Sequence, residues 1–361
     1  MDSIRLARGH GRAVCLWENV EGVLTDGDNA FGCFLSGLAG IDAPMESPLG
    51  KRTKRVKRDG KTLDVEVAAK WPDAGVLYGK DRNVAWRVLD AKYFGLPQQR
   101  RRIYVVAGGK EFRPENVLFE TGRLLSDPFN AKASDEYGTL PLFSSQSVDD
   151  TAYQSVDRTL ARVMDNCHVE VFRTYTDCLY AAYGTNWNGN AAALNGSLFV
   201  CQDGRLRRLT PMEAERIMGF PDDYTLLTGC KDTQRYRATG NSWAVNVGRW
   251  IARRLCGSDA LPPLPLPVAA TMRGDGYALY TFKDFVPVAD GKYINASAMP
   301  YDLCTANILD FVDTHAADKF YISPAGCAGI LRRKEEHNSR INPRLEAVLR
   351  SCSAVCAGKV V

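Results

Sequence analysis

The spacing of apolar and polar residues in the first hundred positions predicts an α/β fold. Residues 13–17 form a short apolar run typical of a buried strand, which we expect to pair in parallel with its neighbours. Polar residues follow it directly, as they do at the ligand-binding edge of open α/β sheets. The other elements expected here are a helix-like stretch at 3–7, a helix at 31–38, and strands at 84–89 and 103–106 on either side of a polar turn around Pro97.

The pattern changes from about residue 110 to residue 205, where periodicity gives way to turns rich in Asn, Gly, Ser and Thr. This composition predicts a separate module with many loops. Helical signals then return at Thr210, where Pro211 and Glu213 complete a capping box. We also expect Asn246 to cap a helix, whose apolar face would be Val247, Trp250, Ile251 and Leu255.

The last hundred residues begin with a proline-rich stretch at 261–267, which cannot be helical and predicts an extended linker. Ser323-Pro324 then starts a helix expected to reach about Glu336, and Asn342-Pro343 starts another that runs through Leu349. These helices are either a small DNA-binding or docking module or an appendage that packs on the rest of the chain.

Composition narrows the class of protein. A chain of 361 residues with 45% hydrophobic content can bury a full core and form two or three domains. Neither a membrane-spanning apolar run nor a signal-peptide core is present, so we expect a cytoplasmic protein with no membrane partner. The 11 cysteines lack Cys-x-x-Cys spacing and the 4 histidines are scattered, so we expect no metal site and no disulfide framework.

The net charge of +4 permits a nucleic-acid partner without requiring one. Basic residues gather in four runs, at 51–58, 100–102, 205–208 and 332–334. A solvated surface loop is the commoner explanation of any single run. Four such runs together favour contact with phosphates.

Four separated blocks resemble, in their order, the motifs of DNA cytosine-5 methyltransferases, most closely a bacteriophage-like branch. Each block is a weak signal alone, but their order and structural contexts make the resemblance specific. The blocks are Glu18-Asn19-Val20 after the first strand, Pro97-Gln98-Gln99-Arg100-Arg101-Arg102, the stretch from Arg208-Leu209-Thr210-Pro211 to Asp223, and Gly240-Asn241-Ser242.

The first two blocks supply candidate catalytic residues. Attack at C6 of cytosine requires a proton or a strong hydrogen bond at N3, which a buried carboxyl can provide, and we assign this role to Glu18. A carboxylate that caps the following turn is the alternative. Arg100 and Arg102 would hold the O2 oxygen of the base and the distorted phosphates, whereas Arg101 is expected to contact only solvent.

The resemblance implies S-adenosylmethionine as methyl donor, and Asn241 and Ser242 are the candidates for contact with its polar end. Capping of backbone groups is the alternative for both. Gln98 is a candidate DNA contact that could instead brace its loop.

The resemblance also implies a target-recognition domain between the second and third blocks. Three of its residues suit a loop that enters a DNA groove, and equally suit plain turns: Thr185, Asn186 and Asn188. The Thr-Leu pair usual in this domain is Cys178-Leu179 here.

The glycine-rich loop and the Pro-Cys nucleophile of the family have no counterpart, since no cysteine here follows a proline. Cys15 lies in the apolar strand, where a thiol would be inert. The resemblance therefore implies an incomplete Rossmann-like methyltransferase domain of α/β type. We expect the C-terminal half of the catalytic domain at 1–110, the target-recognition domain at 111–206, a return to the catalytic domain at 207–260, and the linker with a small helical extension at 261–361.

The function expected from this resemblance is that of a DNA (cytosine-5)-methyltransferase component, in restriction-modification or in a bacteriophage. It would recognise double-stranded DNA and hold a flipped cytosine in the cytoplasm of a bacterial or phage-infected cell. A complementing N-terminal methyltransferase polypeptide would supply the cysteine. The alternatives are a non-catalytic DNA-binding remnant and a truncated reading frame of an ordinary enzyme.

Overall fold

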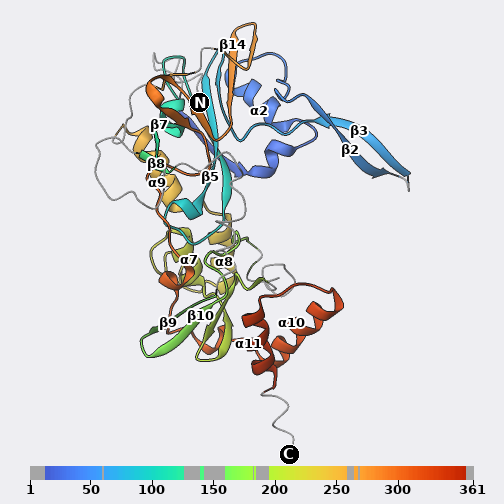
Figure 1. Cartoon of the computed structure of the whole chain (residues 1–361), viewed down its shortest axis with the longest axis vertical. Coiled ribbons are helices and arrows are strands. Elements are labelled where there is room, and N and C mark those ends of the chain that lie inside the picture. Colours follow the sequence, from blue (N-terminus) through green and yellow to red (C-terminus); the bar gives the residue numbers. More distant parts are fainter. Residues whose placement is uncertain are drawn as a thin grey trace, which may run out of the picture. The chain divides into compact units, whose positions relative to one another are not determined.

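The computed structural model describes residues 13–58, 61–125, 139–141, 159–181, 183, 195–257, 264–266 and 269–354. The chain divides into two compact units (Figure 1). Unit 1 consists of residues 1–90, 101–142 and 249–303, and unit 2 of residues 91–100, 143–248 and 304–361. The helix-like stretch at 3–7 lies outside the described residues.

Unit 1 is built on a six-stranded sheet with the order β1-β6-β5-β4-β14-β13. All of its neighbouring strands pair in the antiparallel direction. The expected parallel pairing of the first strand is therefore wrong, because an apolar run reports burial and not strand direction. The strands are β1 (Cys15–Val20), β4 (Ala74–Tyr78), β5 (Asn83–Asp90), β6 (Arg101–Gly108), β13 (Met272–Gly274) and β14 (Tyr277–Phe282).

One face of this sheet packs against helix α2 (Ala30–Ala39), as expected for residues 31–38. Side chains on alternate positions of a strand share a face, so Trp86 and Val88 of β5 and Ile103 and Val105 of β6 join one core with Phe31 of α2. The strands expected at 84–89 and 103–106 are confirmed. A mixed α/β class is confirmed as well.

Unit 1 also contains two smaller sheets. One is an isolated hairpin of β2 (Lys51–Arg58) and β3 (Lys61–Ala68), which projects from unit 1 in Figure 1. The other has the order β15-β16-β7-β8, and only its β7–β8 pairing is parallel. The remaining elements of unit 1 are η1 (Glu21–Thr25), α3 (Glu115–Leu118), β7 (Glu120–Leu125), β8 (Thr139–Pro141), β15 (Phe285–Pro287), η4 (Ala289–Gly291) and β16 (Tyr293–Asn295).

Unit 2 contains a four-stranded antiparallel sheet, with the order β12-β11-β10-β9, and most of the remaining helices. The strands are β9 (Leu160–Met164), β10 (Cys167–Val171), β11 (Phe199–Gln202) and β12 (Arg205–Arg208). The helices are η2 (Ala91–Tyr93), α7 (Pro211–Met218), α8 (Asp232–Asn241), η5 (Ile308–Phe311), η6 (Asp318–Phe320), α10 (Pro324–Glu336) and α11 (Pro343–Ala354), while α9 (Val245–Leu255) has residues in both units.

Two helix starts in unit 2 follow the expected capping chemistry, and a third does not. The capping box of Thr210 and Glu213 is confirmed, and Ser323 caps α10 by accepting from the amide of Gly326. The expected cap at Asn246 is wrong, because α9 begins one residue earlier and the Asn246 amide donates to the Phe94 carbonyl at 2.7 Å.

The two C-terminal helices are part of the core of unit 2. Residues of α10 and α11, among them Ile330, Leu345 and Leu349, are buried against Phe172 and Phe199 beside the four-stranded sheet. Helix α11 continues to Ala354, beyond the expected end. The described contacts therefore match a packing appendage. No helix in the described part of the chain has both the length and the apolar character needed to cross a membrane.

Candidate functional site

The first motif block and the last residue of the second lie side by side in unit 1. In the β1–β6 pairing, Glu18 is opposite Tyr104 and Val20 is opposite Arg102, so Glu18 and Arg102 are diagonal neighbours on one face. The Oε1 atom of Glu18 is 3.3 Å from the Nε atom of Arg102, with side-chain exposures of 13% and 14%. The sheet thus holds a carboxylate against a guanidinium in a largely water-shielded position.

Arg101 points to the other face of β6, and although its side chain is 41% exposed, the expectation that it contacts only solvent is wrong. Its guanidinium donates to both carboxylate oxygens of Glu21, at 2.9 and 3.0 Å, and to Asp73 at 3.3 Å. Arg101 meets Glu21 because Glu21 directly follows Val20, the residue of β1 that pairs with Arg102. The hydrogen bond and charge of Arg101 hold the pKa of Glu21 below its usual value.

Replacement of Arg101 by glutamine is expected to reduce stability at neutral pH and to have little effect at acidic pH. The folded-state pKa of Glu21 is lowered from 4.5, so this stability is present above pH 4.5 and is lost as the pH falls through the folded-state pKa. The difference in Tm between the parent and R101Q should therefore shrink between pH 7 and pH 3 in thermal unfolding. An equal difference at both pH values would contradict the assigned ion pair.

Arg100 of the second block connects two other chain segments within unit 2. Its buried guanidinium donates to the carbonyl of Leu179 at 3.1 Å and to those of Gly240 and Ser242 at 3.3 and 2.8 Å. Three protein carbonyls thus receive hydrogen bonds from one side chain, which ties the second motif block to the fourth. In this structure Arg100 positions the Gly240-Asn241-Ser242 segment.

Gln98 braces the same region. Its side chain is 0% exposed, accepts from the Leu179 amide at 2.9 Å, and donates to the sulfur of Met218 in α7 at 3.0 Å. The Thr176 amide donates to the Pro97 carbonyl at 2.8 Å and the Gln99 amide donates to the Thr176 carbonyl at 2.9 Å, which fixes the loop on the other side. The side chain of Gln98 therefore joins the second block to the third, and its amide faces the protein interior.

The fourth block lies at the end of helix α8, where we expected Asn241 and Ser242 to contact the methyl donor. The Ser242 hydroxyl donates to the Thr239 carbonyl at 2.7 Å, so it closes the helix end, which was the alternative reading. Asn241 is exposed, and its side chain makes no hydrogen bond to any other described residue. Of the two residues, Asn241 is therefore the one whose side chain fits contact with the polar end of a methyl donor.

Gly240 is required by close packing. A Cβ atom built there would lie 2.5 Å from the carbonyl carbon of Tyr180 and 2.6 Å from the nitrogen of Ala181. We expect G240A to lower the free energy of unfolding by roughly 1–3 kcal/mol, because backbone atoms would have to move. Urea unfolding measures the change. The matched control is G248A in α9, where the nearest atom is 3.7 Å away and the change should be neutral or stabilising.

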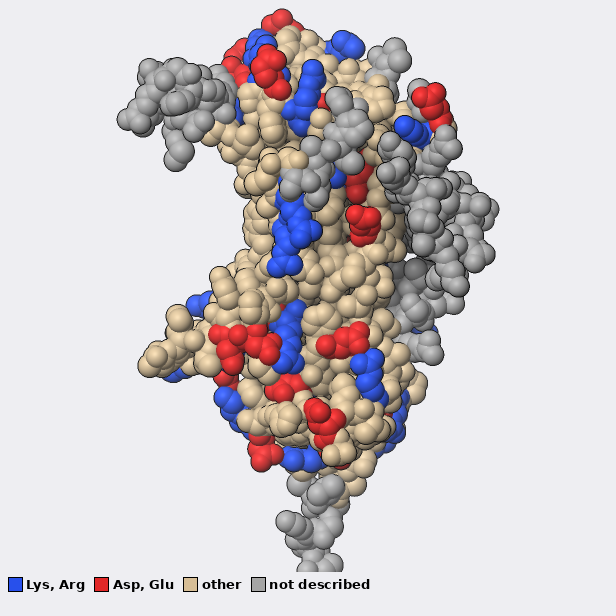
Figure 2. Space-filling view, turned by 90° about the vertical axis from the view of Figure 1, so that its left-hand side faces the viewer, with Lys and Arg blue, Asp and Glu red and all other residues tan. Residues whose placement is uncertain are grey.

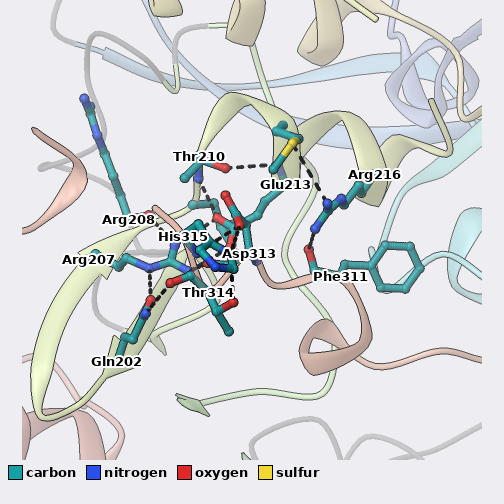
Figure 3. Close-up of polar contacts among 12 residues, drawn as sticks. Gln202, Arg207, Arg208, Thr210, Glu213, Arg216, Phe311, Asp313, Thr314 and His315 are labelled. Atoms are coloured by element: carbon teal, nitrogen blue, oxygen red, sulfur yellow. Dashed lines mark hydrogen bonds and ion pairs between the residues drawn. The ribbon is translucent and has the colours of Figure 1, made fainter. Parts of the chain in front are cut away.

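The third block is organised around a buried ion pair, drawn in Figure 3. Arg207 and Glu213 are both 0% exposed and pair through two hydrogen bonds of 2.9 and 2.8 Å. Glu213 also accepts from the amides of Thr210 and Asp313, at 2.6 and 2.9 Å. Burial disfavours the charge of Arg207, but the attraction of Glu213 keeps the pKa of Arg207 above its ordinary value.

Other charged residues of the third block are neutralised internally as well. Arg216 pairs with Asp222 through two contacts of 2.6 Å, and Glu215 accepts from Arg235 at 2.9 Å. These side chains hold the turn after α7 and leave little charge for an external ligand. These ion pairs stabilise the third block. The spacing of their residues in the sequence did not indicate which pairs form.

Unit 2 therefore brings together the second, third and fourth blocks through Gln98 and Arg100, while unit 1 holds the Glu18–Arg102 pair. Sequence reasoning missed the contacts of Arg101 and Arg207, whose partners could not be identified without the fold. The candidate DNA contacts Thr185, Asn186 and Asn188 lie outside the described residues.

Comparison with known proteins identifies the family. The model of the family described as C-5 cytosine-specific DNA methylase matches residues 78–257. The chain is 31% identical over 345 residues to the DNA N-6-adenine-methyltransferase of Escherichia phage P1, a match covering 67% of this chain and 45% of that protein. It is 26% identical over 181 residues to the type II methyltransferase M.HhaI of Haemophilus parahaemolyticus, covering 49% of this chain and 54% of that protein.

The chain thus spans about half the length of these curated relatives. A solved structure of the Entamoeba histolytica methyltransferase EhMeth matches 49% of this chain and 54% of that chain, at 17% identity and a TM-score of 0.26, too weak a likeness to support any inference. Membership of the family implies S-adenosylmethionine as the cofactor. Through residues 78–257, the chain belongs to the C-5 cytosine-specific DNA methylase family.

Proposed function

We propose that this chain is a component of a DNA cytosine-5 methyltransferase that binds duplex DNA, holds a cytosine outside the helix, and receives its thiolate nucleophile from another polypeptide. The observation that carries the proposal is the paired, shielded carboxylate of Glu18 on the sheet of unit 1. Arg102 keeps that carboxylate in place. A carboxyl so placed can bond both N3 and the N4 amine of a flipped cytosine.

The reaction requires addition of a thiolate to C6, methylation of C5, and loss of the C5 proton as the thiolate leaves. S-adenosylmethionine supplies the methyl group when it is bound. Glu18 would hold the base during all three steps, and Asn241 would contact the polar end of the donor. Arg100 acts in this proposal as a positioning residue, since its hydrogen bonds fix the segment that carries Asn241.

The chain lacks the Pro-Cys pair of the family, and its buried cysteines do not fit the role of the nucleophile. No Pro-Cys pair occurs in the 361 residues. Burial raises the pKa of Cys201 to about 11 and that of Cys327 to about 12, so neither forms a thiolate at neutral pH. Cys15, the cysteine nearest to Glu18 in sequence, is part of the apolar strand β1. We therefore propose a complementing polypeptide with a glycine-rich loop and a Pro-Cys pair.

In this proposal the regions of the chain have separate roles. Residues 1–110 and 207–260 belong to the catalytic domain, 111–206 select the target site, and 261–361 are an extension. Thr185, Asn186 and Asn188 remain our candidates for base contacts, whereas the buried amide of Gln98 supports a bracing role. The place of action would be the cytoplasm of a bacterial or phage-infected cell. The adenine activity named for the phage P1 relative is not carried over, since this chain spans 45% of that protein.

A selection experiment tests the proposal. Full-length chain is incubated with duplexes that contain a random central stretch, and the bound fraction is sequenced. The enriched site should contain a cytosine. A fluorescent cytosine analogue at that position should brighten on binding, because an extruded base is no longer quenched by stacking. Binding without enrichment, or enrichment without brightening, would favour the non-catalytic remnant and contradict the proposal.

A further inference from the structure

The β2–β3 hairpin carries an unusual concentration of positive charge. Six of the eight residues of β2, in the sequence KRTKRVKR, are lysine or arginine and none is acidic. The net charge of the whole chain is only +4, so the remainder of the chain is close to neutral. On the face of the molecule that Figure 2 shows, basic and acidic side chains are interspersed. The hairpin is a local source of positive potential.

The two strands form a separate sheet that is fixed to unit 1 at its base. The amides of Ala68 and Ala69 donate to the carbonyls of Gly27 and Gly50, at 3.3 and 2.9 Å, and Arg52 donates to the Thr25 carbonyl at 3.1 Å. An isolated hairpin is only marginally stable, and these contacts hold its base in place. Strands of eight residues extend for roughly 26 Å.

The strand register places both carboxylates of β3 on one face of the hairpin. Asp64 and Glu66, the acidic residues of β3, lie opposite Arg55 and Thr53, and Arg55 pairs with Asp64 at 3.1 Å. The other face presents Lys54 opposite Val65, and no carboxylate lies on that face among the described residues of the two strands. Two aliphatic side chains on it are exposed, Leu63 at 46% and Val65 at 41%.

We propose that this hairpin is a DNA-binding arm that contacts the phosphates of duplex DNA and presents its carboxylate-free face to a groove. The major groove, about 12 Å wide, admits a two-stranded β-ribbon. Uncompensated lysines bind phosphates, and aliphatic side chains suit thymine methyl groups and sugars. The arm rests on the proposed function, because it supplies sequence-independent affinity to a chain that acts on DNA.

Other occupants of the hairpin fit less well. Residues 51–68 contain no aromatic side chain of the kind that anchors peripheral proteins in a membrane interface. Pairing of β2 with β2 of a second copy would place lysine and arginine side chains against each other, and charged edge strands oppose such pairing. Duplex DNA offers the complementary charge without either difficulty.

The test compares two single variants of the full chain. K54Q removes an exposed lysine of the carboxylate-free face that makes no ion pair with other described residues, and keeps the anchoring Arg52. K283Q removes an exposed lysine elsewhere in unit 1 as a matched control. Fluorescence anisotropy with a labelled 30-base-pair duplex of arbitrary sequence, from 50 to 300 mM salt, gives affinities and salt slopes.

The K54Q variant should bind about 3–6-fold more weakly at 0.15 M salt, with a salt slope smaller by about 0.9, because one phosphate contact is lost. The control variant should match the parent. Parental binding of the duplex by K54Q would overturn the arm while leaving the proposed function intact. The same holds if K54Q loses affinity for anionic phospholipid vesicles but not for the duplex. Failure of the parent chain to bind any duplex at low salt would overturn both proposals.

Discussion

R207M is expected to lower the free energy of unfolding of unit 2 by about 3–5 kcal/mol, because it leaves Glu213 charged and buried without its partner. Both side chains are 0% exposed, so solvent cannot replace the lost guanidinium. The loss also weakens the junction with the segment around Asp313, whose carbonyl accepts from Arg207 at 2.8 Å. Urea unfolding followed by tryptophan fluorescence gives the free-energy change.

The matched control is R205M on the same strand. Arg205 pairs with Asp318 at 3.3 Å, but their side chains are 62% and 88% exposed, so its removal should change stability by less than about 0.5 kcal/mol. The double variant R207M/E213L should recover part of the stability lost in R207M, because no unpaired charge remains. Equal effects of R205M and R207M would show that the buried pair does not organise the third block.

E18Q is expected to weaken binding of the selected duplex by about 10–100-fold, as a charge-assisted hydrogen bond to the flipped cytosine is replaced by a neutral one. The same duplex with an abasic site in place of the target cytosine supplies the control, since it offers no base for residue 18 to hold. Anisotropy with both duplexes measures the difference. We expect E18Q and the parent to bind the abasic duplex equally.

Loss of affinity for both duplexes in E18Q would assign Glu18 a structural role through Arg102 and remove it from the base pocket. The variant R102Q separates the two roles further. It should lower affinity for both duplexes, because Arg102 is proposed to hold phosphates and also to position the Glu18 carboxylate, from which it is 3.3 Å away.

Elements whose boundaries depend on local chemistry were predictable from the sequence. Thr210 and Ser323 mark helix starts because their side chains accept from amides three residues ahead, and proline follows each. The strands near residues 84 and 103 are fully apolar on one face and needed no knowledge of their partners. Strand direction was not predictable in this way, because it depends on the partner strand, and the partner of β1 is β6, which follows it by 80 residues in the chain.

Contacts between distant residues account for the remaining errors. Asn246 looks like a helix cap in sequence, but it bonds to Phe94, 152 residues away. Arg101 reaches Glu21 over 80 residues, a contact that no spacing rule reports. The hairpin was not predicted, because six basic residues in eight favour a solvated loop. The alternation of Thr62, Leu63, Asp64, Val65 and Glu66 was the available signal for a strand.

The most direct measurement is transfer of tritiated methyl groups from S-adenosylmethionine to duplex DNA that carries the selected site. We predict no incorporation by the purified chain alone, and incorporation at cytosine C5 once a polypeptide with a glycine-rich loop and a Pro-Cys pair is added. A type II methyltransferase on its own substrate confirms that the assay detects transfer. Repeated turnover by the purified chain alone would contradict the proposal that its nucleophile comes from another polypeptide.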